Sequence, residues 1–144
     1  MAFLIGGANT LAEETGNDNG IMGFGQNSLV AITNLVSNTG VVATDTAGVG
    51  TERKSLGACE YGDDTGIFGF GAISGAKTSI TSLVSNTGVV SADVTGVGSA
   101  REGPMACSFG GDKGVFAFGY IPGTGETSVS NLVSNTGVVS TDTT

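Results

Sequence analysis

One segment of twelve residues occurs three times in this chain. It begins with Asn or Ser, continues Leu-Val-Ser-Asn-Thr-Gly-Val-Val, and occupies residues 34–45, 82–93 and 131–142, at steps of 48 and 49 residues. A fixed period of this size is typical of repeat architectures, in which each repeat forms one small structural unit. The sequence therefore predicts a single domain built from three copies of one unit.

Two further landmarks accompany this segment. The form Gly-x-x-x-Phe-Gly occurs in every copy, at residues 20–25, 66–71 and 114–119. The form Gly-Val-Gly-x-x-Arg occurs only twice, at residues 48–53 and 96–101. Together the landmarks divide the 144 residues into units at about 1–47, 48–95 and 96–144.

Composition places the units in the all-β class. The chain has 26 Gly, no Trp and no His, and 12% of its residues are charged. Glycine destabilises helix interiors, and the abundant Val, Thr, Ser, Asn and Phe favour strands and turns. Because 39% of the residues are hydrophobic, we expect a packed core rather than a disordered chain.

Four short apolar runs with turns between them fill each unit. In the second unit, runs at 56–61 and 67–70 flank a turn, a third strand is expected at 79–85, and the turn Asn86–Gly88 leads to a fourth strand at 89–94. An Asp-x-Gly triplet ends the first turn of every unit, and we expect its Asp and Gly to form the tight or left-handed backbone of this turn. Four strands in about 48 residues, without helical periodicity, are the outline of one β-propeller blade.

The first unit differs at its start. Its first strand is expected at Leu11–Thr15, and the apolar opening Met1–Gly7 is interpreted as an edge or closing strand. The alternative is that Ala2–Ile5 cross to a partner chain.

The stretch Arg101–Gly119 resembles the first half of a kelch repeat, in which an Arg precedes a small-residue inner strand, a short polar turn and a hydrophobic strand ending in glycine. Residues 53–71 carry the same pattern, and residues 10–25 carry it without the Arg. The resemblance implies a β-propeller whose blades are four-stranded antiparallel sheets. The sequences of residues 131–142 and 96–101 also resemble those of repeat proteins encoded by bacteriophages. This resemblance implies localisation in the host cytoplasm or in the virion.

A closed propeller has about four to eight blades, and three blades per chain are too few to close one. A two-fold dimer is the commonest closed oligomer, and two chains supply six blades. We therefore expect a homodimeric six-bladed ring, whose first partner is a second copy of the chain itself. The junction is expected between Thr144 and Met1 of the neighbour, where a third Gly-Val-Gly-x-x-Arg landmark is missing.

Two sets of repeat-equivalent charged residues are the candidate ligand-binding residues. Asp45, Asp93 and Asp142 each follow a Val-Val strand, where they could bind cations on one face of a ring or accept backbone hydrogen bonds at the strand end. Arg53 and Arg101 end the glycine-rich landmark. They could hold a ligand carboxylate at the channel mouth or tie one blade to the next, for instance through one of these aspartates.

Several functions are not expected from this inventory. With 13 acidic residues against five basic ones, the net charge is −8, and no basic cluster exceeds two residues, which disfavours nucleic acid as a partner. No stretch approaches the roughly 20 apolar residues of a membrane span. Without His, the usual nucleophile–base pairs are absent, and the acidic pairs Glu13–Glu14 and Asp63–Asp64 are interpreted as turn formers. We expect no enzyme activity, no cofactor and no metal site.

The two cysteines, Cys59 and Cys107, occupy equivalent positions in the second and third units. A disulfide or a metal pair is one interpretation. Two small buried hydrophobic residues are the interpretation we favour, because free cysteine is usually buried.

These features favour a self-assembling structural or interaction protein without catalytic activity, and the resemblance to phage repeat proteins implies that a phage encodes it. The alternative is a lectin-like propeller of a phage adhesin, with a carbohydrate as partner. Binding would involve the variable connections, which are 26–29, 72–78 and 120–127, and the aromatic platforms that the loops of the chain offer to a sugar are mainly Tyr61 and Tyr120.

Overall fold

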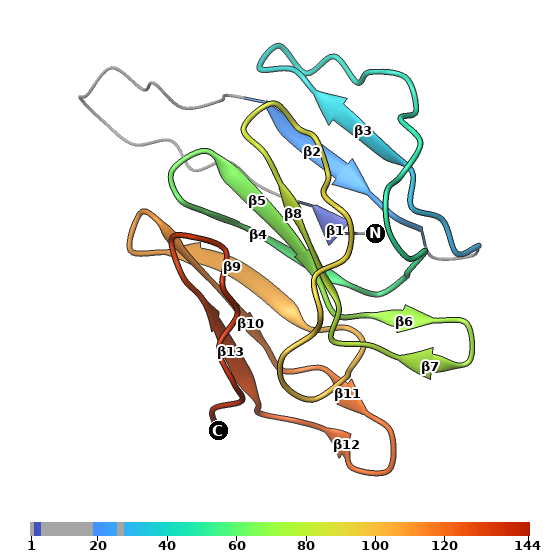
Figure 1. Cartoon of the computed structure of the whole chain (residues 1–144), viewed down its shortest axis with the longest axis vertical. Coiled ribbons are helices and arrows are strands. Elements are labelled where there is room, and N and C mark those ends of the chain that lie inside the picture. Colours follow the sequence, from blue (N-terminus) through green and yellow to red (C-terminus); the bar gives the residue numbers. More distant parts are fainter. Residues whose placement is uncertain (1, 4–18, 26–27) are drawn as a thin grey trace.

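Three small antiparallel sheets follow one another along the chain, and two short hairpins extend from one end of them (Figure 1). The structure, a computed structural model, describes residues 2–3, 19–25 and 28–144. These residues form no helix, and so none that could cross a membrane. The all-β class expected from the composition is confirmed, and the three sheets share one strand order.

The first sheet consists of β1 (Ala2–Phe3), β2 (Gly20–Gly23) and β3 (Thr33–Val36). The second sheet consists of β4 (Gly57–Tyr61), β5 (Thr65–Gly69) and β8 (Thr81–Val84). The third sheet consists of β9 (Met105–Phe109), β10 (Lys113–Ala117) and β13 (Ser130–Val133). The hairpins are β6 (Ala72–Ile73) with β7 (Ala76–Lys77), and β11 (Tyr120–Ile121) with β12 (Gly125–Glu126). Both hairpins fall within segments that the sequence marks as variable loops.

The expected fourth strand is reduced to isolated bridges. They join Val36 to Val42 and Thr33 to Thr46, Val84 to Val90 and Thr81 to Val94, and Val133 to Val139 and Ser130 to Thr143. Between the bridges of the second unit, the Leu83 N–H donates to the Ser91 Oγ at 3.0 Å. The Ser91 N–H donates to the Leu83 carbonyl at 2.8 Å. A side-chain hydroxyl thus replaces one backbone acceptor, so a regular ladder does not form at 89–94.

The first hairpin turn lies within the expected residues 62–66, but its left-handed positions differ from those expected. Between β4 and β5 the left-handed residues are Gly62 and Asp63, with φ of 58° and 68°, which suits the twist of a tight hairpin. The glycines of the Asp-x-Gly triplets, Gly66 and Gly114, lie inside β5 and β10 instead. At Gly114 the reason is packing, because a Cβ there would lie 2.5 Å from the Cys59 sulfur. The prediction that these glycines supply the left-handed backbone is therefore wrong.

The start of the chain forms an edge strand of its own sheet. Ala2 pairs with Gly23 and Phe3 with Met22 in β2, which is the place that β4 and β9 take in the other sheets. The expectation of an edge strand is confirmed for these two residues. The strand expected at Leu11–Thr15 lies outside the described residues.

The hydrophobic core lies between successive sheets. Side chains alternate along a strand, so each sheet has two faces. We call the face toward the preceding sheet the leading face, and the face toward the following sheet the trailing face. Phe68, Val84 and Val90 on the leading face of the second sheet pack with Ile21 and Phe24 on the trailing face of the first. The same contact recurs between the second and third sheets, where Cys59, Tyr61, Ile67 and Phe70 meet Phe116, Val133 and Val139.

Glycines provide the space for the leading-face aromatic ring. A Cβ at Gly69 would lie 2.7 Å from Cζ of Phe116, and a Cβ at Gly57 would lie 3.0 Å from its Cδ1. The Phe116 ring meets the Phe70 ring edge to face, with centroids 5.2 Å apart. These two glycines are therefore required by the close approach of an aromatic ring.

Candidate functional site

Arg101 lies between the second and third sheets with its side chain fully buried. Its guanidinium carbon is 3.9 Å from the centroid of the Phe70 ring. Its Nε donates to the Phe118 carbonyl at 2.8 Å, its Nη1 to the Ser99 carbonyl at 3.3 Å and its Nη2 to the Phe116 carbonyl at 3.4 Å. The side chain therefore joins the trailing face of the second sheet to the backbone of the third.

Arg53 takes the equivalent place between the first and second sheets and is also fully buried. Its guanidinium lies 4.8 Å from the centroid of the Phe24 ring, and its Nη2 donates to the Ser82 Oγ at 2.9 Å. Nη1 is 3.8 Å from Oδ1 of Asp93. Among the described residues, however, neither Nε nor Nη1 has a hydrogen-bond partner. Arg53 thus makes fewer hydrogen bonds than Arg101, its counterpart in the next repeat.

Burial lowers the pKa of both guanidinium groups, and the nearby carboxylates of Asp93 and Asp142 oppose this effect. Neither arginine side chain has exposed surface. A ligand carboxylate could reach Arg53 or Arg101 only if the contact between sheets opened. The geometry favours their interpretation as ties between repeats.

Two of the candidate aspartates bind the glycine-rich landmark. Asp93 accepts the Thr51 N–H at 2.9 Å and the Thr51 hydroxyl at 2.6 Å. Asp142 accepts the Ser99 N–H at 3.1 Å and the Ser99 hydroxyl at 2.7 Å. The donors belong to the connection that enters the same sheet rather than to the strand end itself.

The third candidate, Asp45, differs. It is exposed and accepts the Asn34 Nδ2–H at 2.8 Å, while the described part of the chain places no Ser or Thr of a glycine-rich landmark against it. Asn131 supplies the corresponding bond to Asp142 at 2.9 Å. Burial by itself would raise the pKa of Asp142, but hydrogen bonds from Ser99 and Asn131 outweigh it and hold the pKa below its usual range.

Three phenylalanines share an uncommon backbone conformation. Phe24, Phe70 and Phe118 precede the last glycine of the Gly-x-x-x-Phe-Gly landmarks and have φ of 63°, 62° and 64°. Positive φ is uncommon for residues other than glycine. The first two rings are each covered by an arginine, Arg53 and Arg101. Phe70 has no exposed surface, whereas the Phe118 side chain is 55% exposed.

The trailing face of the third sheet carries apolar residues whose equivalents are buried one repeat earlier. Phe109, at 41% exposure, corresponds to Tyr61, at 8%, and the exposed Phe118 corresponds to the buried Phe70. The full set of Cys107, Phe109, Val115, Phe118 and Leu132 corresponds to Cys59, Tyr61, Ile67, Phe70 and Leu83. Contiguous exposed apolar residues mark an interaction surface. We take this free trailing face as one half of the candidate site.

The leading face of the first sheet is the other half. Val42 is 52% exposed, whereas its equivalents Val90 and Val139 are buried. Met22 and Val36 on the same face are half-buried. Among the described residues, one face of each kind thus remains unpartnered, at opposite ends of the series of sheets. Apart from Cys107, sequence reasoning did not single out the residues of these two faces, although superposing the repeats would have marked them as apolar positions.

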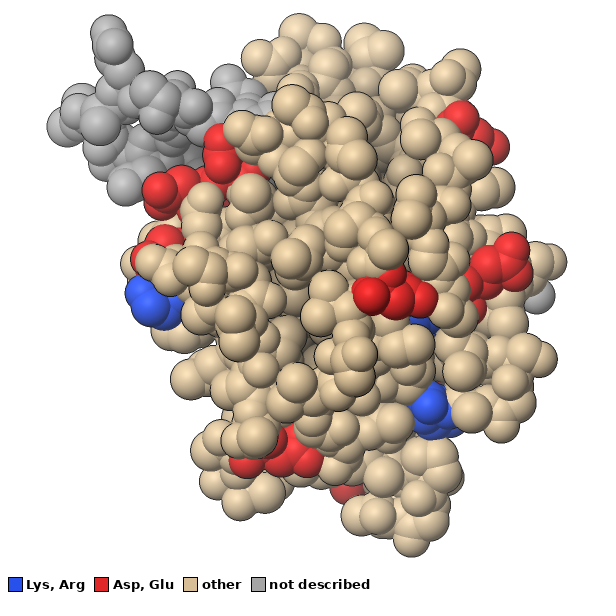
Figure 2. Space-filling model, viewed as in Figure 1, with Lys and Arg blue, Asp and Glu red and all other residues tan. Residues whose placement is uncertain are grey.

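Charge does not single out a further site on the face that Figure 2 shows. Several acidic groups lie near one another at the upper left of this view, the other acidic groups are isolated, and few basic groups are visible. Within residues 2–3, 19–25 and 28–144, no group of three or more His, Cys, Asp or Glu side chains is placed to hold a metal ion.

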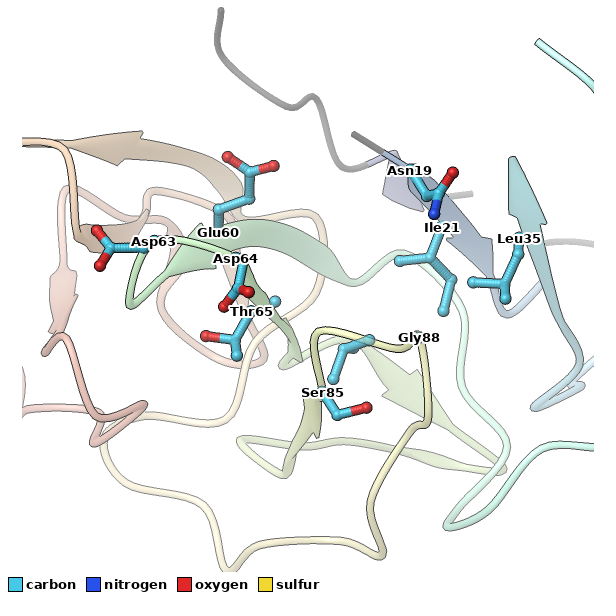
Figure 3. Close-up of a pocket in the computed structure, with 12 residues that line it drawn as sticks. Asn19, Ile21, Leu35, Glu60, Asp63, Asp64, Thr65, Ser85 and Gly88 are labelled. Atoms are coloured by element: carbon cyan, nitrogen blue, oxygen red, sulfur yellow. The ribbon is translucent and has the colours of Figure 1, made fainter. Parts of the chain in front are cut away.

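A pocket opens between the first and second sheets (Figure 3). Ile21 and Leu35 line one side, and Glu60, Asp63 and Asp64 line the other. Its volume is about 40 Å³. Pockets for small molecules usually measure about 300–1,000 Å³, so this one has room only for water.

Two sequence interpretations change at the level of single residues. Cys59 is buried as expected, and burial raises the pKa of its thiol to about 12. The same expectation is wrong for Cys107, which is exposed because it lies on the free trailing face. Tyr61 is buried and its ring packs against Gly137, so it offers no platform to a sugar, whereas Tyr120 is exposed on β11.

No protein-family model matches the chain, and a search of curated proteins gives no match. Among solved structures it is similar to a fungal alcohol oxidase of the AA5 family, determined in complex with copper. The TM-score is 0.58 at 16% sequence identity, and the match covers 85% of this chain and 27% of the oxidase chain. The likeness concerns the fold alone.

Proposed function

We propose that the chain is a self-assembling β-propeller protein with a structural or interaction role and no catalytic activity. Its three sheets are three blades, and two copies close a six-bladed ring. In that ring the free trailing face of the third sheet packs on the free leading face of the first sheet of the other copy. The chain already uses this kind of contact twice internally, which supports its use between copies.

A matched exchange of small and large residues carries the proposal. Between the second and third sheets, the Phe116 ring lies on Gly57 and Gly69. The third sheet has Met105 and Ala117 at the positions of these two glycines. The free trailing face of the third sheet therefore has less room for an aromatic ring than the trailing face of the second sheet.

The first sheet carries the complementary change. Met22 stands at the position that Phe68 and Phe116 occupy in the other sheets. Methionine is unbranched and flexible, and it fills irregular spaces better than an aromatic ring does. The two faces that meet in the proposed ring have thus changed together.

Substituting Met22→Phe tests this fit. Overpacking costs about 1–3 kcal/mol at each of the two equivalent junctions of the ring, so we expect the dissociation constant of the dimer to rise at least about tenfold. The triple variant Met22→Phe, Met105→Gly, Ala117→Gly restores the internal arrangement and should recover tight association. Val89→Phe is the control, because Val89 is exposed even in the central repeat.

Sedimentation velocity over a range of concentrations is the measurement. A species of twice the 14.1 kDa chain mass that responds to Met22→Phe supports the ring. A monomer of 14.1 kDa at every concentration overturns it.

Glycan binding is the second candidate, and one observation supports it. Tyr120 is exposed and pairs across β11–β12 with Glu126, which places an aromatic ring beside a carboxylate on an exposed hairpin. Reproducible binding of one sugar class on a glycan array, lost in Tyr120→Ala, would favour this role. A blank array would leave assembly as the sole proposal.

A further inference from the structure

Each fixed residue of the glycine-rich landmark has a defined neighbour in the internal contacts. The first glycine packs against the preceding sheet. A Cβ at Gly48 would lie 1.6 Å from the Ala31 carbonyl oxygen, and one at Gly96 would lie 2.1 Å from the Ser79 Oγ. No larger residue fits at either position.

The second glycine and the residue after it fit the aspartate of the following sheet. A Cβ at Gly50 would lie 2.5 Å from Oδ1 of Asp93, and the same aspartate takes both donors of Thr51. Gly98 and Ser99 repeat this arrangement on Asp142. The arginine two residues later then covers the left-handed phenylalanine of the preceding sheet. The fold therefore recognises Gly-x-Gly-(Ser/Thr)-x-Arg at four positions.

The receptors for a third such segment are present at the two ends of the chain. Phe118 has the left-handed backbone and exposed ring already described. Its N–H donates to the Val129 carbonyl as that of Phe70 does to Ile80, so the exposed Ser128 stands where Ser79 receives the first glycine. Asp45 stands where Asp93 and Asp142 receive the hydroxyl residue.

The chain has no arginine to spare for Phe118. Arg53 and Arg101 are its two arginines, and both are buried in the internal contacts. A guanidinium that stacked on Phe118 would therefore have to come from outside residues 1–144.

We propose that the junction between two copies binds a peptide segment of the form Gly-x-Gly-(Ser/Thr)-x-Arg, supplied from outside residues 1–144. Its arginine stacks on Phe118 of one copy, and its Ser or Thr donates twice to Asp45 of the other. The inference rests on the proposed ring, because the two receptor halves meet only when two copies associate.

A labelled peptide with the sequence of residues 46–55, Thr-Ala-Gly-Val-Gly-Thr-Glu-Arg-Lys-Ser, is the probe. Fluorescence anisotropy measures its binding to the full chain, and sedimentation velocity measures the dimer with and without it. Hydrogen bonds to charged groups contribute about 1.5–3 kcal/mol, so exchanging the peptide arginine for alanine should weaken binding at least about tenfold. Phe118→Ala and Asp45→Asn should weaken it similarly.

Asp45→Asn separates the two proposals, because this carboxylate lies outside both apolar faces. Peptide binding that requires the arginine, Asp45 and Phe118, with dimerisation of Asp45→Asn unchanged in the absence of peptide, supports the inference. A dimer that does not bind the peptide overturns the inference but not the proposed ring. A chain that stays monomeric with and without the peptide overturns both.

Discussion

The guanidinium of Arg101 lies 3.9 Å from the centre of the Phe70 ring, and the two residues belong to different repeats. The Arg101 carbonyl also accepts the N–H of Gly71 at 2.9 Å. One residue thus contributes a stacked cation and a backbone bond to the contact between two sheets. A buried cation of this kind is stabilising only when its donors are satisfied.

Arg101→Ala should therefore destabilise the chain strongly. The variant loses three hydrogen bonds and the stack on Phe70, which we estimate at about 3 kcal/mol or more, or a fall of at least about 6 °C in Tm. Arg53→Ala should cost less, because two nitrogens of Arg53 lack partners among the described residues. Thermal unfolding followed by circular dichroism measures both, and an unchanged curve for Arg101→Ala would refute its structural role.

Gly69→Ala should disturb the same contact by overpacking. The added methyl group would lie 2.7 Å from the Phe116 ring, and we expect a loss of about 1–3 kcal/mol in the free energy of unfolding. Urea denaturation gives the value. The double variant Gly69→Ala, Phe116→Leu should recover part of the loss, and a double variant less stable than both single variants would contradict the packing explanation.

Asp142 should contribute stability that depends on pH. Its pKa is lowered from 3.8 in the folded chain, so its contribution is present above pH 3.8 and is lost as pH falls through the folded value. Asp142→Asn should be less stable than the wild-type chain at neutral pH, and the difference should shrink below pH 3.8. Urea midpoints measured across this range test the prediction, and a difference that is constant with pH would argue against it. Ser99→Ala removes one donor and should reproduce part of the loss.

The two thiols should react at different rates with a disulfide reagent. The exposed Cys107 should react quickly, and Cys59 should react slowly, because it is buried and its pKa is raised to about 12. Cys107→Ser should remove the fast phase. In the proposed ring Cys107 is covered by the other copy, so its rate of reaction should fall as the protein concentration rises. If both thiols reacted equally fast, the burial of Cys59 on β4 would be contradicted.

The features that local sequence determines were predictable. The repeat fixes which residues are equivalent, and the turn expected at Asn-Thr-Gly is present. Its glycine is left-handed in each copy, with φ of 79°, 78° and 77° at Gly40, Gly88 and Gly137. The glycines of the Asp-x-Gly triplets were misassigned, because a glycine in a strand can serve the packing of a neighbouring sheet. Gly114 shows this through its approach to Cys59.

The candidate site was predictable only in part. The recurrence of Arg53 and Asp93 suggested a tie between repeats, and the structure places them 3.8 Å apart. The stack of each arginine on a phenylalanine was not predictable, since it depends on how two sheets lie relative to one another. The exposure of Phe118 could likewise not be predicted from its own repeat, because Phe118 differs from Phe70 only in having no following sheet packed on it.

Every contact between the sheets joins a trailing face to a leading face. A gene duplication that inserts one more repeat of about 48 residues between existing ones would reproduce this contact and leave the end faces as they are. Loss of one internal repeat would do the same. Such a chain can change its repeat number during evolution without redesigning its ends, so repeat number is the property most free to vary among proteins built on this unit.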